Sequence, residues 1–539
     1  MGQIAYRANL SAATFPMTLA DGGRTVIVPG PDQNFDRRVD PTGEQKEAGI
    51  PQALYLENVI PTSYGYQSVG YVRHTAPVAV SGSYIFGVFP VYAVAGDVAY
   101  KNFVFSSDTG SYRCGQFGTN LITYVGTPMA TGDILSSAYV RGTAYVFAEG
   151  SDQIYEVLGN TGALQFTNVT ASVTPLNFFN TSGIKQIISF ANYLIAISFS
   201  GRVYWSSLTT ALDFVSSLVS GSGSIIPNDL VGRVTDVTLC SGGFYIYTTQ
   251  NSVYVQYTGN ARYPFKFTVV KDSQGAPLLF PLLIKSTAGS TENSANVVAE
   301  PTRAIKYIEK DLARDIGDDI SDFLKNTSTQ ALLDYTTNTL TQQSVNTKYP
   351  LVHIWQSRHV FISINDAVGD LTSQYTHVIV YDTLTNRTGK LKVRHKFIIL
   401  SDLYGAGFVE SDQKLIRWIN LDIYNVRPPF TPNIQETAEA ALLLGKFQYV
   451  RSRMMRMEEI EIEGPQNTAI VPSPNFSVFL LPSQDGRNFN SPVALSDPTI
   501  SGGLATYTCH HTAKNHSLLI KGVFSINTVQ LRFVPGGDR

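Results

Sequence analysis

The sequence predicts a mainly β protein built around a β-propeller of about six blades, and three observations point to it. A strand-turn-strand pattern recurs along the chain. When the return strands are aligned, Tyr112, Tyr155, Tyr204 and Tyr254 share one register, at intervals of 43, 49 and 50 residues. Only 15% of residues are charged, whereas Tyr and Phe number 29 each, a balance that favours strands over helices. A hairpin repeated every 40 to 50 residues or so is typical of propellers, whose blades are small antiparallel sheets of about four strands.

Side chains alternate in the best copies of this repeat. Along Tyr193–Phe199 the apolar residues follow a period of two, which predicts a strand with at least one buried face. Ser200-Gly201 is a tight-turn signal, and Arg202–Ser206 is predicted to be the return strand. The pattern returns about fifty residues later as Phe244–Thr249 and Val253–Tyr257. Two successive hairpins of one form support a repeat fold.

The propeller is predicted to cover residues 82–426. Upstream of the best copies, Ala144–Ala148 and Gln153–Val157 form a strand and its return. Downstream, Tyr381 and Trp418 mark two further return strands, so that six markers predict about six blades. A large sandwich, or stacked hairpins without radial closure, would give similar local patterns. The even spacing favours the propeller.

One segment within this range departs from the β pattern. Its apolar residues recur at spacings of three and four: Ile305, Ile308, Leu312, Ile316 and Ile320. This periodicity predicts an amphipathic helix over residues 302–325, inserted between blades. Four aspartates between positions 315 and 322 are interpreted as a solvated face rather than as metal ligands.

Residues 1–81 and 427–539 lie outside the repeat. The first is predicted to be an N-terminal arm and part of a platform, with a polar stretch at 29–49. The second is predicted to be a separate C-terminal β platform. Within it, carboxylates alternate with isoleucines along Glu458–Glu463, which predicts a strand with one buried face. Three arginines just before that strand favour cross-strand or inter-subunit pairing with carboxylates over contact with DNA. We expect both terminal regions to make subunit contacts.

Composition excludes several classes of protein. The net charge is −2 and the sequence pI is about 6.5, so the basic excess of a protein that grips nucleic acid is missing. Three cysteines give no disulfide framework and fit a reducing compartment. No signal-peptide pattern opens the chain, and no apolar run is long enough to predict a membrane span.

A search for catalytic or ligand-binding motifs finds none that predicts chemistry. The sequence holds no GxSxG, P-loop, HExxH or paired CxxC motif. The one soft-ligand cluster comprises Cys509, His510 and His511, with His516 nearby. Because neighbouring residues of a strand point to opposite faces, Cys509 and His511 could share a face that His510 could not. We expect no metal, no cofactor and no enzymatic activity.

A resemblance to a known family enters between residues 190 and 275. The residues that carry it are Tyr204, Trp205, Asp213, Phe214, Tyr257, Gly259, Asn260, Pro264 and Phe265. In this order they resemble the tail nozzle proteins of short-tailed bacteriophages, also called tail tubular protein B. A later hairpin, HVIVYDTLTNRTGKL, is similar to another blade of that family, but it has Arg387-Thr388-Gly389 where the family leads us to expect Trp-Gly.

The resemblance implies a structural role in the virion tail. Nozzle proteins form a six-subunit ring beyond the portal and the adaptor, and each subunit carries a propeller and a β-rich platform. Genomic DNA leaves through the central channel. The implied partners are five further copies of the chain, the tail adaptor, tail fibres or spikes, and duplex DNA in transit without tight binding. Such a protein would be made in the host cytoplasm.

Two other functions fit a propeller of this composition. One is a carbohydrate-binding or carbohydrate-cleaving receptor-recognition propeller of a phage tail, whose paired acids would be distant in sequence. The other is an interaction propeller that acts on the host side. A nozzle should stay with the connector on purification, whereas a glycan module should bind sugar by itself.

The charge balance leads to a prediction about DNA. Each phosphate held by Lys or Arg adds salt-dependent affinity, and such contacts multiply around a ring. With 40 basic and 42 acidic residues, we expect a channel wall that is neutral to acidic, so that the duplex slides. Binding of the purified protein to duplex DNA should be undetectable at physiological salt in a fluorescence anisotropy titration. A sub-micromolar affinity with a steep salt dependence would contradict this.

Overall fold

A computed structural model gives the structure of a large part of the chain. The described residues are 14–18, 53–62, 65–69, 71–74, 85–95, 98–107, 110–114, 122–124, 135–158, 165–260, 262–277, 295–316, 329–334, 339–344, 350–364, 375–385, 387–401, 405–410, 415–419, 434–437, 439–447, 454–463, 476–484, 491–501, 503–526 and 528–535. Their structure is mainly β, as predicted. Helix among them is limited to α2 (Phe178–Ser182) and the 3-10 turn η1 (Thr170–Ser172).

Four successive antiparallel sheets of four strands each occupy residues 85–269, and within each sheet the strands pair in chain order. The first comprises β6 (Ile85–Ala95), β7 (Val98–Ser107), β8 (Gly110–Cys114) and β9 (Ile122–Tyr124). The second comprises β10 (Leu135–Val140), β11 (Thr143–Ala148), β12 (Gln153–Leu158) and β13 (Gln165–Asn168). The third comprises β14 (Ile184–Phe190), β15 (Tyr193–Ser198), β16 (Val203–Trp205) and β17 (Gly223–Ile225). The fourth comprises β18 (Val234–Cys240), β19 (Gly243–Thr248), β20 (Ser252–Tyr257) and β21 (Phe265–Val269).

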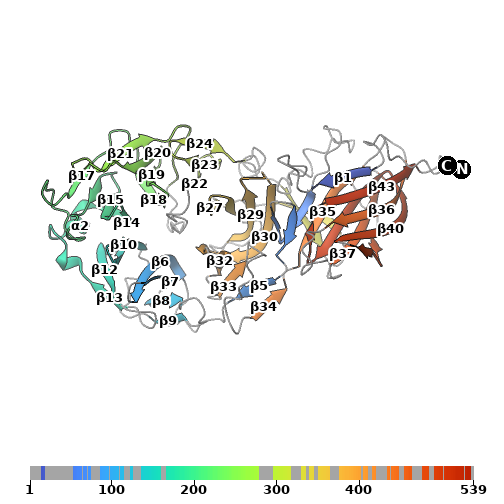
Figure 1. The fold of residues 1–539 in the computed structure, drawn as a ribbon, viewed down its shortest axis with the longest axis horizontal. Coiled ribbons are helices and arrows are strands. Elements are labelled where there is room, and N and C mark those ends of the chain that lie inside the picture. Colours follow the sequence, from blue (N-terminus) through green and yellow to red (C-terminus); the bar gives the residue numbers. More distant parts are fainter. Residues whose placement is uncertain are drawn as a thin grey trace.

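Three further sheets follow in the chain. The fifth comprises β22 (Asn296–Ala299), β23 (Ile305–Glu309) and β24 (Leu312–Asp315). The sixth comprises β27 (Leu351–Trp355), β28 (His359–Ile364), β29 (Tyr375–Asp382) and β30 (Arg387–His395). The seventh comprises β31 (Phe397–Ser401), β32 (Gly405–Glu410) and β33 (Leu415–Ile419). A separate hairpin, β25 (Thr329–Asp334) and β26 (Thr339–Ser344), lies between the fifth and sixth in sequence. Figure 1 shows the seven sheets following one another around one part of the molecule.

The four aligned tyrosines lie in equivalent strands. Tyr112, Tyr155, Tyr204 and Tyr254 belong to β8, β12, β16 and β20, each the third strand of its sheet. Two later markers, in β29 and β33, also lie in third strands. The fifth sheet has no aromatic marker on its third strand, β24 (LARD), so a count of markers misses it.

The prediction of a helix over residues 302–325 is wrong for residues 302–316, the part of this segment that the structure describes. Residues 305–315 form the hairpin of β23 and β24, which turns at Lys310 in the left-handed region, and residues 317–325 lie outside the described residues. Ile305 and Ile308 are fully buried, but Tyr307 between them is buried as well. Backbone pairing of β23 with β22 on one side and β24 on the other outweighs a helical spacing of isoleucines.

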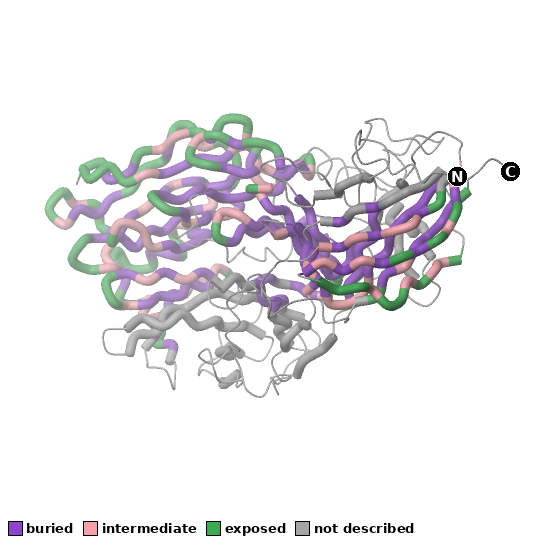
Figure 2. Tube along the Cα trace, turned by 45° about the vertical axis from the view of Figure 1, so that its right-hand side comes forward, coloured by how far each residue is buried: buried purple, intermediate pink, exposed green. Residues whose placement is uncertain are grey.

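The ends of the chain meet in two five-stranded sheets that share one apolar core. One sheet has the order β1-β43-β36-β40-β39 and the other β2-β35-β41-β37-β38. Their strands are β1 (Thr14–Thr18), β2 (Ala53–Glu57), β35 (Ala441–Phe447), β36 (Met455–Glu463), β37 (Phe476–Ser483), β38 (Val493–Leu495), β39 (Thr499–Ser501), β40 (Leu504–Ala513), β41 (Asn515–Gly522) and β43 (Thr528–Pro535). Ile460 and Ile462 of β36 point into this core, as their alternation predicts. Figure 2 shows the buried positions running along the strands of both sheets.

N-terminal strands also join the sixth and seventh sheets to this region. The sixth sheet continues from β30 through β3 (Val59–Pro61) and β4 (Tyr66–Ser68) to β42 (Ser525–Ile526). The seventh is extended by β5 (Tyr71–His74), which pairs with β33 and β34 (Ile434–Thr437). A Cβ at Gly389 would lie 2.2 Å from the carbonyl oxygen of Val59, so only glycine lets β3 approach β30 this closely. The close approach of β3 therefore explains why position 389 holds a glycine.

Candidate functional site

Part of the family motif forms an aromatic cluster between the third and fourth sheets. Phe265, which is 7% exposed, lies at its centre. Its ring centroid lies 5.6 Å from Trp205, 5.7 Å from Tyr193, 6.1 Å from Phe244, 6.3 Å from Tyr257 and 6.4 Å from Phe190. Aromatic pairs at these separations add to the apolar area that they bury. These motif residues therefore hold two sheets together.

A second aromatic cluster joins the second and third sheets. Phe214 stacks on Phe178 of α2, with ring centroids 4.3 Å apart. Tyr204 meets the same Phe178 edge-on at 5.0 Å, and Phe179 stacks on Phe147 of β11 at 5.0 Å. The short helix α2 therefore fills the space between two sheets, and the motif residues Tyr204 and Phe214 pack on it.

Asp213 fastens its loop to the segment before α2. Its carboxylate accepts hydrogen bonds from the Thr174 hydroxyl at 3.0 Å and from the Val215 N–H at 3.1 Å. The backbone pairs here as well, because the Phe214 N–H donates to the Thr174 carbonyl at 2.7 Å. These contacts give Asp213 a positional role in joining its loop to the segment before α2.

The remaining motif residues close the loop between β20 and β21. The Thr258 N–H donates to the Pro264 carbonyl at 2.8 Å. The Asn260 side-chain oxygen accepts from the Arg262 N–H at 2.8 Å, and Gly259 has a φ of 76°, where glycine is favoured. Pro264 and Gly259 thus shape the turn that brings Phe265 into the first cluster.

The loop between β16 and β17 is ordered and yet exposes apolar side chains. The indole N–H of buried Trp205 donates to the Gly221 carbonyl at 2.9 Å, and the Ser217 N–H donates to the Ser222 carbonyl at 3.1 Å. Exposed apolar residues of this loop are Leu208, Val215, Leu218 and Val219, of which Val219 is fully exposed; Ile225 and Ile226, at the end of β17 and just after it, are exposed as well. Asp213 is the one charged residue between positions 203 and 227. A fixed loop that is apolar and poor in charge has the character of a protein contact surface.

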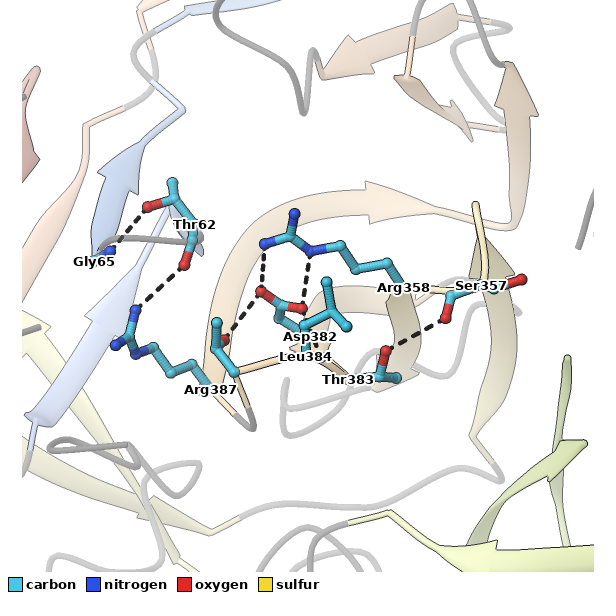
Figure 3. Close-up of polar contacts among 9 residues, drawn as sticks. Thr62, Gly65, Ser357, Arg358, Asp382, Thr383, Leu384 and Arg387 are labelled. Carbon is cyan, nitrogen blue, oxygen red and sulfur yellow. Dashed lines mark hydrogen bonds and ion pairs between the residues drawn. The ribbon is translucent and has the colours of Figure 1, made fainter. Parts of the chain in front are cut away.

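A buried ion pair lies in the sixth sheet (Figure 3). Asp382 is fully buried and accepts two hydrogen bonds from Arg358, at 3.0 Å from Nε and 2.7 Å from Nη2. The Leu384 N–H and the Thr385 hydroxyl donate to the same carboxylate, each at 3.0 Å. Burial would raise the pKa of Asp382, but the hydrogen bonds and charge of Arg358 outweigh it and lower that pKa below its ordinary value. All four contacts come from this sheet, so the pair is structural.

The cluster of Cys509 and histidines is split between core and surface. Cys509 is buried and donates to the Met457 carbonyl at 3.5 Å, while His510 is exposed, as alternation along β40 predicts. Burial raises the pKa of the Cys509 thiol to about 12, so the thiol is neutral. A ring nitrogen of His516 lies 3.2 Å from the His511 carbonyl. Within the described part of the chain, no three His, Cys, Asp or Glu side chains are placed to hold a metal ion.

Comparisons with known proteins add little to this geometry. No model of a known protein family matches the chain, and no curated protein matches it. An extracellular domain assigned to a one component system of B. thetaiotaomicron is 9% identical, with a TM-score of 0.35; the match covers 92% of this chain and 64% of that domain. The computationally designed Ika8 protein is 10% identical (TM-score 0.34; 64% of this chain, 99% of that one), and BamB from Moraxella catarrhalis is 8% identical (TM-score 0.26; 61% and 92%). With TM-scores this low, conclusions rest on the residues of this chain.

No helix in the described ranges is both long enough and apolar enough to cross a membrane.

Proposed function

We propose that the protein is a structural subunit of a short phage tail, which assembles with copies of itself into a ring-shaped nozzle for genome ejection. The observation that carries the proposal is the order of motif residues from Tyr204 to Phe265, which resembles tail nozzle proteins. These residues form sheet contacts and a loop closure, as the clusters around Phe214 and Phe265 show. A motif that specifies architecture suits a structural protein better than an enzyme.

We further propose that the seven small sheets are the blades of a propeller. In support, first strands of neighbouring sheets contact one another: β6 with β10, β10 with β14, β14 with β18, and β22 with β27. The first strand of the seventh sheet, β31, contacts β6 of the first. N-terminal β5 completes the seventh sheet, so residues from both ends of the propeller share one blade. A radial closure of this kind removes long exposed edges.

Two surface properties support an assembled state. The loop between β16 and β17 exposes Leu218 and Val219 at 78% and 100%, with little charge around them. Charge over the whole chain is well below the usual quarter of residues. Both suit a subunit that other proteins cover. In this proposal the partners are further copies in a hexamer and the tail adaptor, and the protein resides in the virion tail.

Copurification distinguishes this function from sugar recognition. We expect the tagged full-length chain, expressed with a phage portal and adaptor, to copurify with the connector and to show no binding on a glycan array. The connector expressed with an unrelated tagged protein is the matched control for nonspecific capture. Glycan binding by the isolated chain without connector association would overturn the proposal in favour of a receptor-recognition propeller.

A further inference from the structure

We propose that the contact between the sixth and seventh sheets is an acid-sensitive joint, closed while His353 and His395 are neutral and opened when they are protonated. Both imidazoles are fully buried. His353 of β27 pairs in register with Phe361 of β28, so the two share one face of the sixth sheet. That face packs on the seventh sheet, since Phe361 and Phe408 lie 6.4 Å apart.

The described surroundings of His353 offer no hydrogen-bond acceptor to a protonated ring. Neither of its ring nitrogens has a hydrogen-bond partner in the described structure. Burial, with a smaller effect from the charge of His395, lowers the pKa of His353 to about 3. A protonated imidazole donates from both nitrogens, so charging this ring in the closed joint would leave two buried donors unpaired.

Both ring nitrogens of His395 have hydrogen-bond partners. Its Nδ1 lies 2.9 Å from the Val393 carbonyl, which can only accept, so the proton of the neutral ring is on Nδ1. Its Nε2 lies 2.8 Å from the Ser363 hydroxyl, which can donate to it. The ring meets Phe408 edge-on at 5.2 Å, directly across the joint. Burial lowers the pKa of His395 to about 4. The hydrogen bond to Val393 acts to raise this pKa, and the charge of His377 acts to lower it.

Surrounding groups supply little compensating charge in the described residues. Tyr375 of β29 stacks on His395 at 5.6 Å, and Arg394 and Lys396 flank His395 in the chain. His359 lies on the same face, with its ring centroid 5.8 Å from that of Trp355. Burial lowers the pKa of His359 to about 4; the charge of Asp382 acts to raise it and that of Arg358 to lower it. The described core residues of β31 and β32 at this joint, Ile398, Ala406 and Phe408, are apolar.

The sign of the pH effect follows from these directions. The pKa values of His353 and His395 in the folded protein, about 3 and about 4, lie below the ordinary value of 6.5. At pH values between the lowered pKa values and the ordinary one, the closed joint therefore binds fewer protons than the open joint. Its stability is complete above pH 6.5 or so and falls as the pH drops towards about 4.

Hydrogen exchange read by mass spectrometry on the full chain tests the joint. After correction for intrinsic rates, strands β27, β28 and β32 should lose protection reversibly between pH 6.5 and 4.5 or thereabouts, while β15 and β19 remain protected. His353→Leu, neutral and of similar volume, should lower the midpoint of this loss by about half a pH unit or more. The matched control is His510→Leu, at an exposed histidine, which should leave the midpoint unchanged.

His353→Gln provides a second neutral variant if the leucine side chain prevents folding. Protection of the joint down to pH 4.5 in the unmodified chain would overturn the proposal. So would a simultaneous loss of protection in all strands, or a wild-type midpoint in both His353 variants. Because this inference concerns one contact between two sheets, its failure would leave the proposed nozzle function untouched.

Discussion

Phe265→Ala should lower the free energy of unfolding by about 3–5 kcal/mol, the range for removing a buried phenylalanine. The reason is its central place between the third and fourth sheets, in contact with five other rings including Trp205 and Phe244. Removing it leaves a cavity that rigid strands on both sides cannot fill. Trp205 belongs to this cluster and is one of three tryptophans in the chain, so urea unfolding followed by tryptophan fluorescence measures the loss of stability.

Val269→Ala is the matched control for this substitution. Val269 lies on the same strand, β21, but is 37% exposed, so its truncation should change stability by less than about 0.5 kcal/mol. A loss of less than about 1 kcal/mol for Phe265→Ala would mean that the cluster does not hold the two sheets together.

Asp382→Ala should destabilise the sixth sheet by about 3 kcal/mol. It leaves the Arg358 guanidinium without its carboxylate and removes the acceptor of the Leu384 N–H. Because the pKa of Asp382 is lowered in the fold, the stabilisation is present above the ordinary carboxyl pKa. It is lost as the pH falls through the lowered value. Urea titrations at pH 7, compared with the unmodified chain, measure the effect.

The ion pair of Lys306 and Asp315 gives a direct comparison. Its atoms lie 3.2 Å apart, but Asp315 is about half exposed, so Asp315→Ala should cost less than about 1 kcal/mol. Equal losses from Asp382→Ala and Asp315→Ala would show that burial does not strengthen the first pair. Asp382→Asn, which keeps the shape but not the charge, should fall between the two.

The strands of the third and fourth sheets could be predicted from sequence because their signal is local. Side chains alternate along β15 and β19, and turn residues separate each strand from its return. The fifth sheet could not be predicted in this way. Ile305 and Ile308 are spaced as on a helix, and what decides the structure is pairing with β22, which lies in a segment without a repeat marker.

The motif residues could be located from sequence, but their structural roles could not. Phe214 contacts Phe178, and Asp213 contacts Thr174, although the three strands β14, β15 and β16 intervene in the sequence. The burial of His353 and His395 beside the seventh sheet escaped the sequence altogether, because neither residue belongs to a motif. Such contacts depend on how successive sheets pack, and a strand pattern contains no information about that packing.

The most direct test of the nozzle proposal is an averaged electron-microscope image of phage particles in which mass spectrometry detects this chain. The proposal predicts six copies around a central channel at the distal end of the tail, each with a propeller and a β platform that fit the density. A tail channel built wholly from other proteins, or this chain found only in peripheral fibres or spikes, would contradict it.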